Sequence, residues 1–407
     1  MSMSDRPVSP PGLPVTIAVL GASSLTVMAN ATISPGLPGL NDHFADVPNI
    51  RFLAGLIVTL PSLFVILFAS GFGWLADRYD RLHILMAGMA IYALGGVSGL
   101  FVETLPAMLV GRAILGIGVA GTMTLAITLA GDLWHGEARQ KFMGLQAAAM
   151  SGGGVVFIML GGLLASMSWR LPFLIYLLAL PFAVYAGLAL RAADTRPTRA
   201  KTPEALTGGD VAQTPPFPWA RVGPVYLLGF VFMVVFYLVP TQLPFLLASM
   251  DITSPSAAAL GMASATLVSV PGSMLYGRLR RHVSGAGIFG MGFVIMGVGV
   301  SILSVAGNFA TIILGTLTLG GGMGTIFPNF NAFIMGRVPD ALRGRASGMT
   351  TTSIFGGQFL SPFASAPIIA AWGLRNTFLF FAVIMLAIGI GIALGAMRGS
   401  ARQVREA

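Results

Sequence analysis

Twelve apolar stretches, most of them near 20 residues long, follow one another along the chain and constrain its fold more than any other feature. They are continuous, whereas the strands of a membrane barrel alternate apolar and polar residues. A helix needs about 20 apolar residues to cross the hydrocarbon core of a bilayer, where every backbone group must be satisfied internally. Only 9% of the residues are charged, against about a quarter in a soluble domain. The sequence therefore predicts an all-α integral membrane protein of about twelve transmembrane helices.

The predicted spans fall into two sets of six, separated by a polar stretch. Their boundaries are 14–40, 52–73, 84–102, 105–131, 142–167 and 171–191, and then 223–249, 257–277, 285–305, 308–336, 346–371 and 374–397.

Basic residues indicate the orientation. With the N-terminus inside, 19 of the 23 Lys and Arg residues fall in loops or tails on the same side as that terminus. Basic loops stay on the cytoplasmic side of the membrane. We therefore expect a multi-pass protein of the cytoplasmic (inner) membrane with both termini in the cytoplasm.

An internal repeat relates the two sets of spans. Residues 73–153 align without gaps on 277–357, at an offset of 204, with 14 identities in 81 positions, against about 7 expected by chance. Two copies of six helices that both start inside form a parallel repeat about an axis along the membrane normal. This predicts two pseudo-symmetric six-helix bundles, residues 1–191 and 223–407. Residues 192–222, rich in Pro, Gly and mixed charge, form a cytoplasmic linker between them.

The loop after the second span carries a family signature. Its sequence Gly73-Trp74-Leu75-Ala76-Asp77-Arg78-Tyr79-Asp80-Arg81 resembles the glycine-x-leucine-alanine-aspartate-arginine-x-glycine-arginine motif of the major facilitator superfamily, with Asp80 in place of the second glycine. A shorter copy, 277–281, stands at the equivalent place in the second half. The segment 112–118 is similar to the arginine-x-x-glutamine-glycine-x-glycine motif of the fourth span, with Leu115 in place of glutamine. The resemblance implies a transporter, of the branch that exports drugs or metabolites.

One departure bears on the coupling. Exporters of this superfamily often carry a glycine-proline-x-x-glycine-glycine element in the fifth span, and here Phe157 and Ile158 replace its first two residues. This departure removes support from an antiporter assignment. The final glycines, Gly161 and Gly162, are present.

The loop signature predicts a gate. Asp77 is expected to face the N-terminus of the eleventh helix, whose partial positive charge favours a carboxylate, with Arg343 or Arg345 as its partner. The alternative is a loop that only fixes orientation. The residues assigned to gating or coupling are Gly73, Asp77, Arg78, Arg81, Arg112, Arg343 and Arg345.

Arg112 lies two turns inside the fourth predicted span. A guanidinium there is costly unless it faces water or a partner, so it is a functional candidate. The family resemblance implies a role in proton coupling or in substrate binding. The alternative is that its side chain snorkels to the outer surface.

Polar residues on the first, seventh and tenth predicted spans form a candidate substrate site, because the family resemblance places these helices around a central cavity. Nearby prolines, at 35, 38, 240, 244 and 328, are expected to bend or unwind the helices. For each polar residue alone, a helix-to-helix hydrogen bond is the competing interpretation. With Arg112, the predicted set is Asn30, Thr32, Tyr237, Thr241, Gln242, Asn329 and Asn331.

Several functions are excluded or disfavoured by what the sequence lacks. It has no cysteine, no GxSxG, no phosphate-binding loop and no histidine–carboxylate cluster, so we expect no enzyme, no cofactor and no metal site. The net charge of +9 lies in short loops and does not indicate nucleic acid. No acidic residue lies near the middle of a span, which favours neutral or anionic substrates.

These observations predict a secondary active transporter that moves a small organic solute by alternating access, by efflux of a drug or metabolite. We expect a monomer in the lipid bilayer, with protons as the candidate coupling ion. Two alternatives stay open: import of a small polar or anionic nutrient, and a non-transporting membrane receptor or scaffold.

Overall fold

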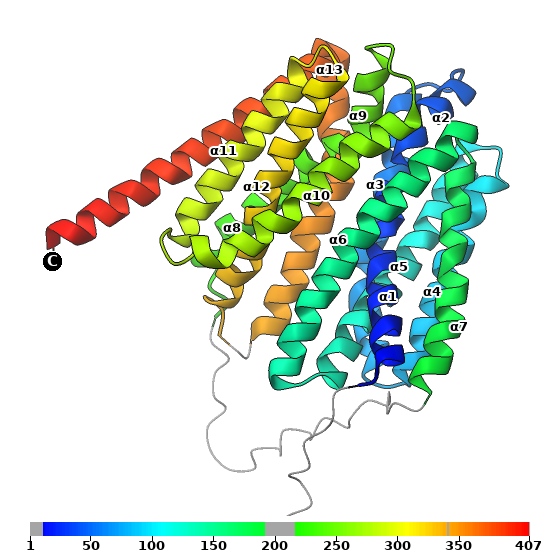
Figure 1. The fold of residues 1–407 in the computed structure, drawn as a ribbon, viewed down its shortest axis with the longest axis horizontal. Coiled ribbons are helices and arrows are strands. Elements are labelled where there is room, and N and C mark those ends of the chain that lie inside the picture. The colour runs from blue at the N-terminus through cyan, green and yellow to red at the C-terminus, as the bar shows by residue number, and fades with distance from the viewer. Residues whose placement is uncertain (1–10, 192–215, 340–341, 407) are drawn as a thin grey trace, which may run out of the picture.

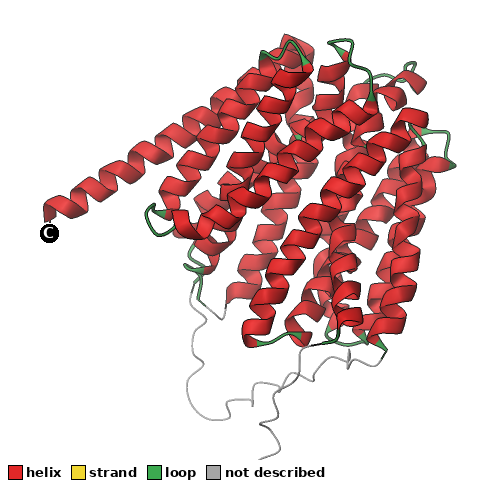
Figure 2. Cartoon of the chain, in the orientation of Figure 1, coloured by secondary structure: helices red, strands yellow, loops and turns green. Residues whose placement is uncertain are grey.

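The computed structural model describes residues 11–191, 216–339 and 342–406, and within these ranges the side chains of Asn30 and of residues 398–406 are not described. Every regular element in the described residues is a helix (Figure 2). The elements are α1 (Leu13–Ala31), η1 (Ser34–Gly36), α2 (Leu37–His43), α3 (Ile50–Ala76), α4 (Arg81–Val97), η2 (Ser98–Leu100), α5 (Leu105–Leu133), α6 (Gly136–Met167), η3 (Leu171–Leu178), α7 (Ala179–Leu190), α8 (Trp219–Phe236), α9 (Leu238–Ala248), α10 (Pro255–Leu279), α11 (Gly285–Ser304), α12 (Phe309–Met335) and α13 (Arg343–Glu406).

The predicted fold class is confirmed. Eleven helical segments of the described residues are long and apolar enough to cross a membrane. The last of them, Arg343–Met397, is two predicted spans in one: α13 is interrupted at Gly373, whose φ of 79° and ψ of 171° are not helical. Such a φ is easy only for glycine. The two arms of α13 therefore correspond to the predicted eleventh and twelfth helices.

The first helix of each half is interrupted at the equivalent place. The first spans Leu13–His43, with α1 ending at Ala31 and η1 and α2 following it. The seventh spans Trp219–Ala248, with α8 ending at Phe236 and α9 starting at Leu238. Prolines remove a helix hydrogen bond, and they lie in both of these regions, as the sequence predicts.

The internal sequence repeat corresponds to equivalent helix packing in the two halves. A Cβ on Gly95 of α4 would overlap the backbone nitrogen of Leu115 on α5, and a Cβ on Gly299 of α11 would overlap that of Leu319 on α12. Gly299 and Leu319 stand 204 residues after their counterparts. Small residues let membrane helices approach closely. The glycines that identify the repeat are therefore the places where backbones touch.

The two halves also use equivalent helices against each other. Within the first half, α5 packs on α3 and α4, and within the second, α12 packs on α10 and α11. Between the halves, α6 packs on α10 and α3 on α13 (Figure 1). This arrangement supports the proposed division into two bundles. Of the predicted linker, residues 192–215 lie outside the described residues, and α8 begins inside the remainder, at Trp219.

Candidate functional site

The seam between the halves is tight at one end and open at the other. On α6, a Cβ at Gly162 would collide with Ala259 of α10, whereas one at Gly154 would lie 3.9 Å from the Cγ2 of Thr266. A Cβ at Gly144, further toward the start of α6, would meet no described atom within 4 Å. The contact of α6 with α10 therefore loosens toward the end that holds the loop 77–80.

The second seam, between α3 and α13, changes in the same direction. A Cβ on Gly55 would meet the ring of Pro362 at 3.2 Å. One to two turns further along, the Ser62 hydroxyl donates to Gln358 Oε1 at 2.9 Å. Gly73, near the end of α3, again has open space around it. Both seams thus open at the same face of the molecule.

The opposite face is closed by polar and aromatic contacts. Arg51 of α3 donates from Nε to Gln242 Oε1 of α9 at 3.3 Å, and its guanidinium lies 4.8 Å from the centroid of the Phe245 ring. Arg51 Nη2 is buried and has no hydrogen-bond partner among the described residues. At the tight end of the α6–α10 contact, the hydroxyls of Ser166 and Ser256 lie 3.0 Å apart. Side chains of both halves therefore meet across this end.

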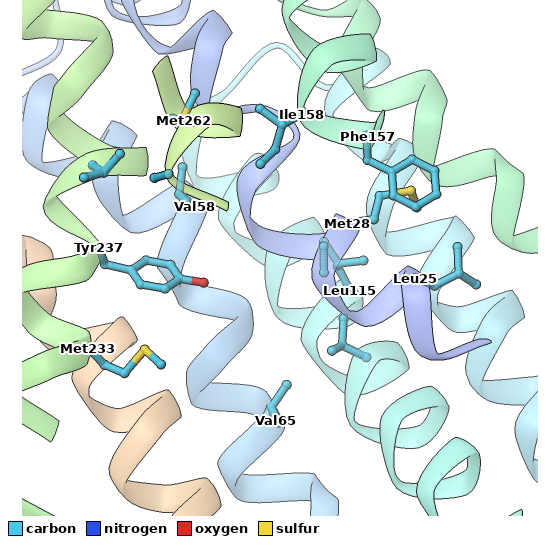
Figure 3. Close-up of a cluster of buried hydrophobic side chains, with 14 of the residues drawn as sticks. Leu25, Met28, Val58, Val65, Leu115, Phe157, Ile158, Met233, Tyr237 and Met262 are labelled. Carbon is cyan, nitrogen blue, oxygen red and sulfur yellow. The ribbon is translucent and has the colours of Figure 1, made fainter. Parts of the chain in front are cut away.

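Between the two ends lies an apolar centre built by both halves (Figure 3). The first half contributes Met28 and Phe157, and the second contributes Met233, Tyr237 and Met262, all less than a tenth exposed. Methionine is flexible and polarisable, so it adapts to ligands of different shapes. All five side chains are buried and belong to one apolar cluster.

The predicted polar lining is largely satisfied within its own helices. The Thr32 hydroxyl donates to Met28 O at 2.6 Å, and that of Thr241 donates to Tyr237 O at 2.6 Å. Asn329 donates from Nδ2 to Gly285 O at 2.8 Å and so ties α12 to the start of α11. Asn331 makes only a long bond, of 3.5 Å, to Phe327 O in its own helix. The hydrogen bonds of these four side chains do not join any one of them to another.

Of the remaining predicted site residues, Tyr237 belongs to the apolar centre and Gln242 to the closed end. Asn30 lies in the last turn of α1, and its side chain falls outside the described part.

Arg112 is fully buried inside the first bundle and does not reach the surface. It donates from Nη1 to the Tyr176 hydroxyl at 3.1 Å and from Nη2 to Gly96 O at 3.0 Å. Its guanidinium lies 4.7 Å from the centroid of the Phe173 ring. The Nε atom is buried with no hydrogen-bond partner among the described residues, and none of the ion pairs found there includes Arg112. It is a buried cation held by neutral groups.

Tyr176 connects this cation to α1. Its hydroxyl donates to Ala29 O at 2.9 Å, two residues before α1 ends. Through Tyr176, the last turn of α1 is thus joined by hydrogen bonds to Arg112.

The loop signature is organised within the first half. Arg81 forms an ion pair with Asp132 at the end of α5 and donates from Nε to Ala76 O at 3.2 Å. Asp77 is exposed and close enough to interact electrostatically with Arg81. The exposed Arg78 stacks on Trp74, with 3.8 Å from its guanidinium to the ring centroid. The signature thus joins α3, α4 and α5.

The structure does not bring this loop onto α13. Arg345 lies over the Phe217 ring, at 5.1 Å, on its own side of the seam. No ion pair among the described residues joins Asp77 to Arg343 or Arg345. A gate between these groups would require the open end of the seam to close.

Three residues of the seam are not predicted from the sequence: Arg51, Ser62 and Gln358. In the sequence, Arg51 counts only as one of the few basic residues on the outer side. The available signal is an arginine in the first turn of an apolar helix, with no acidic residue within the same turn.

The two bundles meet along a seam that is closed at one end and open at the other. The family model of the Major Facilitator Superfamily matches residues 19–362 and 251–406. The chain belongs to the Major Facilitator Superfamily.

Individual relatives are similar over part of the chain. The bacillibactin exporter of Bacillus subtilis (strain 168) is 31% identical over 39% of this chain and 40% of its own length. The class C tetracycline resistance protein of Escherichia coli is 30% identical over 39% and 40%. These matches span about two fifths of the relatives' length. The crystal structure of the POT family transporter PepTSo superimposes with a TM-score of 0.76 at 15% identity, over 97% of this chain and 99% of that one, which shows the shared fold.

Proposed function

We propose that this protein exports an apolar organic compound, neutral or anionic, by secondary active transport with alternating access. The observation that carries the proposal is the apolar centre. A polar nutrient would need several fixed hydrogen-bond partners, whereas Thr32, Thr241 and Asn329 use theirs within the protein. Methionine and aromatic surfaces suit an organic compound.

The charge preference comes from Arg112. It lies one helical turn before Leu115, a member of the apolar centre (Figure 3). Two unit charges about 10 Å apart interact by about 1.7 kcal/mol at an effective dielectric constant of 20. An uncompensated cation at this place disfavours a cationic substrate and favours an anionic one.

The transport movement follows from the seam. The present conformation is closed by Arg51 and Gln242 and open at the loop end, which the basic-residue count places in the cytoplasm with both termini. In the opposite conformation, the loop end closes and Asp77 reaches the start of α13, near Arg343 and Arg345. The inner-membrane location, the orientation and the monomeric state are part of the same proposal.

The named relatives support export. Two of them are named for the export of bacillibactin and for resistance to tetracycline. For this chain we propose the same direction of transport, without assigning it bacillibactin or tetracycline as substrate.

Protons are the proposed counter-ion. Asp132, paired with Arg81 at the open end, is the carboxylate that a rearrangement of the loop would release. Export into inverted vesicles should therefore respond to an imposed pH gradient, and Asp132→Asn should abolish that response while leaving downhill exchange.

Alternating access is tested by locking the closed end. The natural chain contains no cysteine, so Ser166→Cys with Ser256→Cys gives one cross-linkable pair across the seam. Oxidation should stop transport, because the outer end cannot open, and reduction should restore it. The single variants are the controls. Transport at an unchanged rate by the oxidised double variant would refute the movement.

A further inference from the structure

A groove lies on the second bundle, away from the seam. Its walls are Val268 and Leu275 of α10 on one side and Met291 and Ile295 of α11 on the other, and α12 forms its floor. It encloses about 580 Å³. The groove has no role in the proposed transport movement.

The floor is open because it is built from glycine. Gly321 of α12 lies between the walls, and a Cβ there would only just reach Val268 and Ile295, at 3.9 Å each. Nearby, the backbones of α10 and α12 cross closely, since a Cβ on Gly272 would come within 3.2 Å of Gly324 Cα. Both α10 and α11 pack on α12, and the furrow lies between these two helices over Gly321.

The groove opens toward lipid. On α10, an exposed apolar stripe runs through Leu260, Leu267 and Met274, which are 45%, 62% and 79% exposed. The polar Ser273 lies on another side of the same helix and donates to Gly324 O of α12 at 3.0 Å. In a spanning helix, a long exposed apolar stripe faces acyl chains. Leu275, which adjoins the groove, is itself 53% exposed.

One end of the groove is cationic. Arg278 and His282 line it there, and Arg280 and Arg281 lie in the same turn, all four exposed. The chain has no acidic residue between Asp251 and Asp340. The segment thus offers three permanent positive charges and a histidine ring, with no carboxylate close in sequence to neutralise them.

We propose that this groove binds an anionic phospholipid. One acyl chain lies between α10 and α11 over Gly321, and the phosphate lies against Arg278 and His282. Basic pockets at the cytoplasmic ends of membrane helices attract anionic headgroups, and arginine binds phosphate through charge-assisted hydrogen bonds. A zwitterionic lipid offers the same acyl chain and phosphate, but its ammonium group is repelled by the cations at this end, so the anionic lipid is favoured.

The test measures lipid binding by the full-length protein in detergent, by native mass spectrometry and by thermal stability, since a ligand of the folded state raises the melting temperature. The probes are phosphatidylglycerol and phosphatidylcholine with identical acyl chains. Phosphatidylglycerol should bind at least tenfold more tightly. Arg278→Gln with His282→Gln should remove that preference, and Gly321→Leu should block the acyl chain.

Arg221→Gln and Leu267→Trp are the matched controls, an exposed cation and an exposed apolar residue outside the groove, and neither should change binding. Equal binding of the two lipids, or a preference that survives the Arg278 and His282 substitutions, would overturn the proposal. Glycerol phosphate is the headgroup-only probe, and equal affinity for it would show a free-anion site instead. Because the readout is binding, the result is independent of whether the chain exports anything.

Discussion

Arg112 in the first bundle and Thr316 in the second occupy equivalent places, 204 residues apart, and their surroundings differ completely. Arg112 is a buried cation with one unpartnered nitrogen. Thr316 is equally buried, and its hydroxyl is satisfied by Ile312 O at 3.1 Å and the Ser264 hydroxyl at 2.7 Å. Similar helix packing therefore holds a charge in one half and a closed neutral pair in the other.

The loop ends show the same contrast. In the first half, Arg81 at the start of α4 is joined to Asp132 at the end of α5 by an ion pair. In the second, the start of α11 is joined to α12 by the neutral bond from Asn329 to Gly285 O. The halves share their backbone packing and differ in charge. We infer that the first bundle supplies the electrostatics of transport and the second supplies a matching surface.

The strongest test of this difference between the halves replaces each of the two equivalent residues with alanine. Arg112→Ala should lower transport of an anionic compound about twentyfold, because it removes an attraction of about 1.7 kcal/mol and each 1.36 kcal/mol is a factor of about ten in rate. Thr316→Ala should change it less than twofold. Initial rates in vesicles, normalised to folded protein, measure both.

Arg112→Lys separates charge from geometry. Lysine keeps the charge but cannot hold both Tyr176 and Gly96 O in the planar geometry of guanidinium, so we expect an intermediate rate. Equal rates for Arg112→Ala and Thr316→Ala would remove the functional asymmetry between the bundles.

The shared packing is tested by the repeated glycines. Gly95→Ala and Gly299→Ala should each lower the free energy of unfolding by about 1–3 kcal/mol, because the added methyl groups collide with backbone and overpacking typically costs that much. Titration with sodium dodecyl sulfate provides the measurement. Gly144→Ala and Gly348→Ala, a repeated pair with open space around both positions, should cost nothing. Markedly unequal costs for Gly95 and Gly299 would contradict equivalent packing.

Those glycines also show which features of the fold can be predicted from the sequence. The span order and the repeat were readable because lipid imposes length and close packing imposes glycine at fixed spacing. The satisfied hydroxyls of Thr32 and Thr241 were foreseeable in principle, since threonine in a helix often bonds the carbonyl four residues back. The contact of Arg51 with Gln242 could not be predicted, because it depends on which face of α3 meets the other half. That is a property of how the bundles dock, which no local pattern records.

The loop-end ties should differ in strength. Removing one partner of a buried ion pair costs about 3–5 kcal/mol. The Asp132 side chain is 36% exposed, so solvent screening reduces the expected loss for Asp132→Asn to about 2 kcal/mol. Asn329→Ala should lose about 1 kcal/mol, the usual net value of one neutral hydrogen bond. High salt should narrow the gap between the two variants, and a gap unchanged by salt would argue against an electrostatic origin.

The smallest effect is expected at the other end of the same helices, where the halves agree again. Arg170 donates to Leu100 O and Val102 O at 3.3 and 3.4 Å, and Arg375 donates to the equivalent Ser304 O and Ala306 O at 3.4 and 2.6 Å. A cation at a helix C-terminus typically contributes about 0.3–1 kcal/mol. Arg170→Ala and Arg375→Ala should therefore cost similar amounts below about 1 kcal/mol and leave transport rates within twofold. A large loss of transport in only one of them would extend the charge asymmetry to this end of the bundle and weaken the assignment of that asymmetry to Arg112 and the loop.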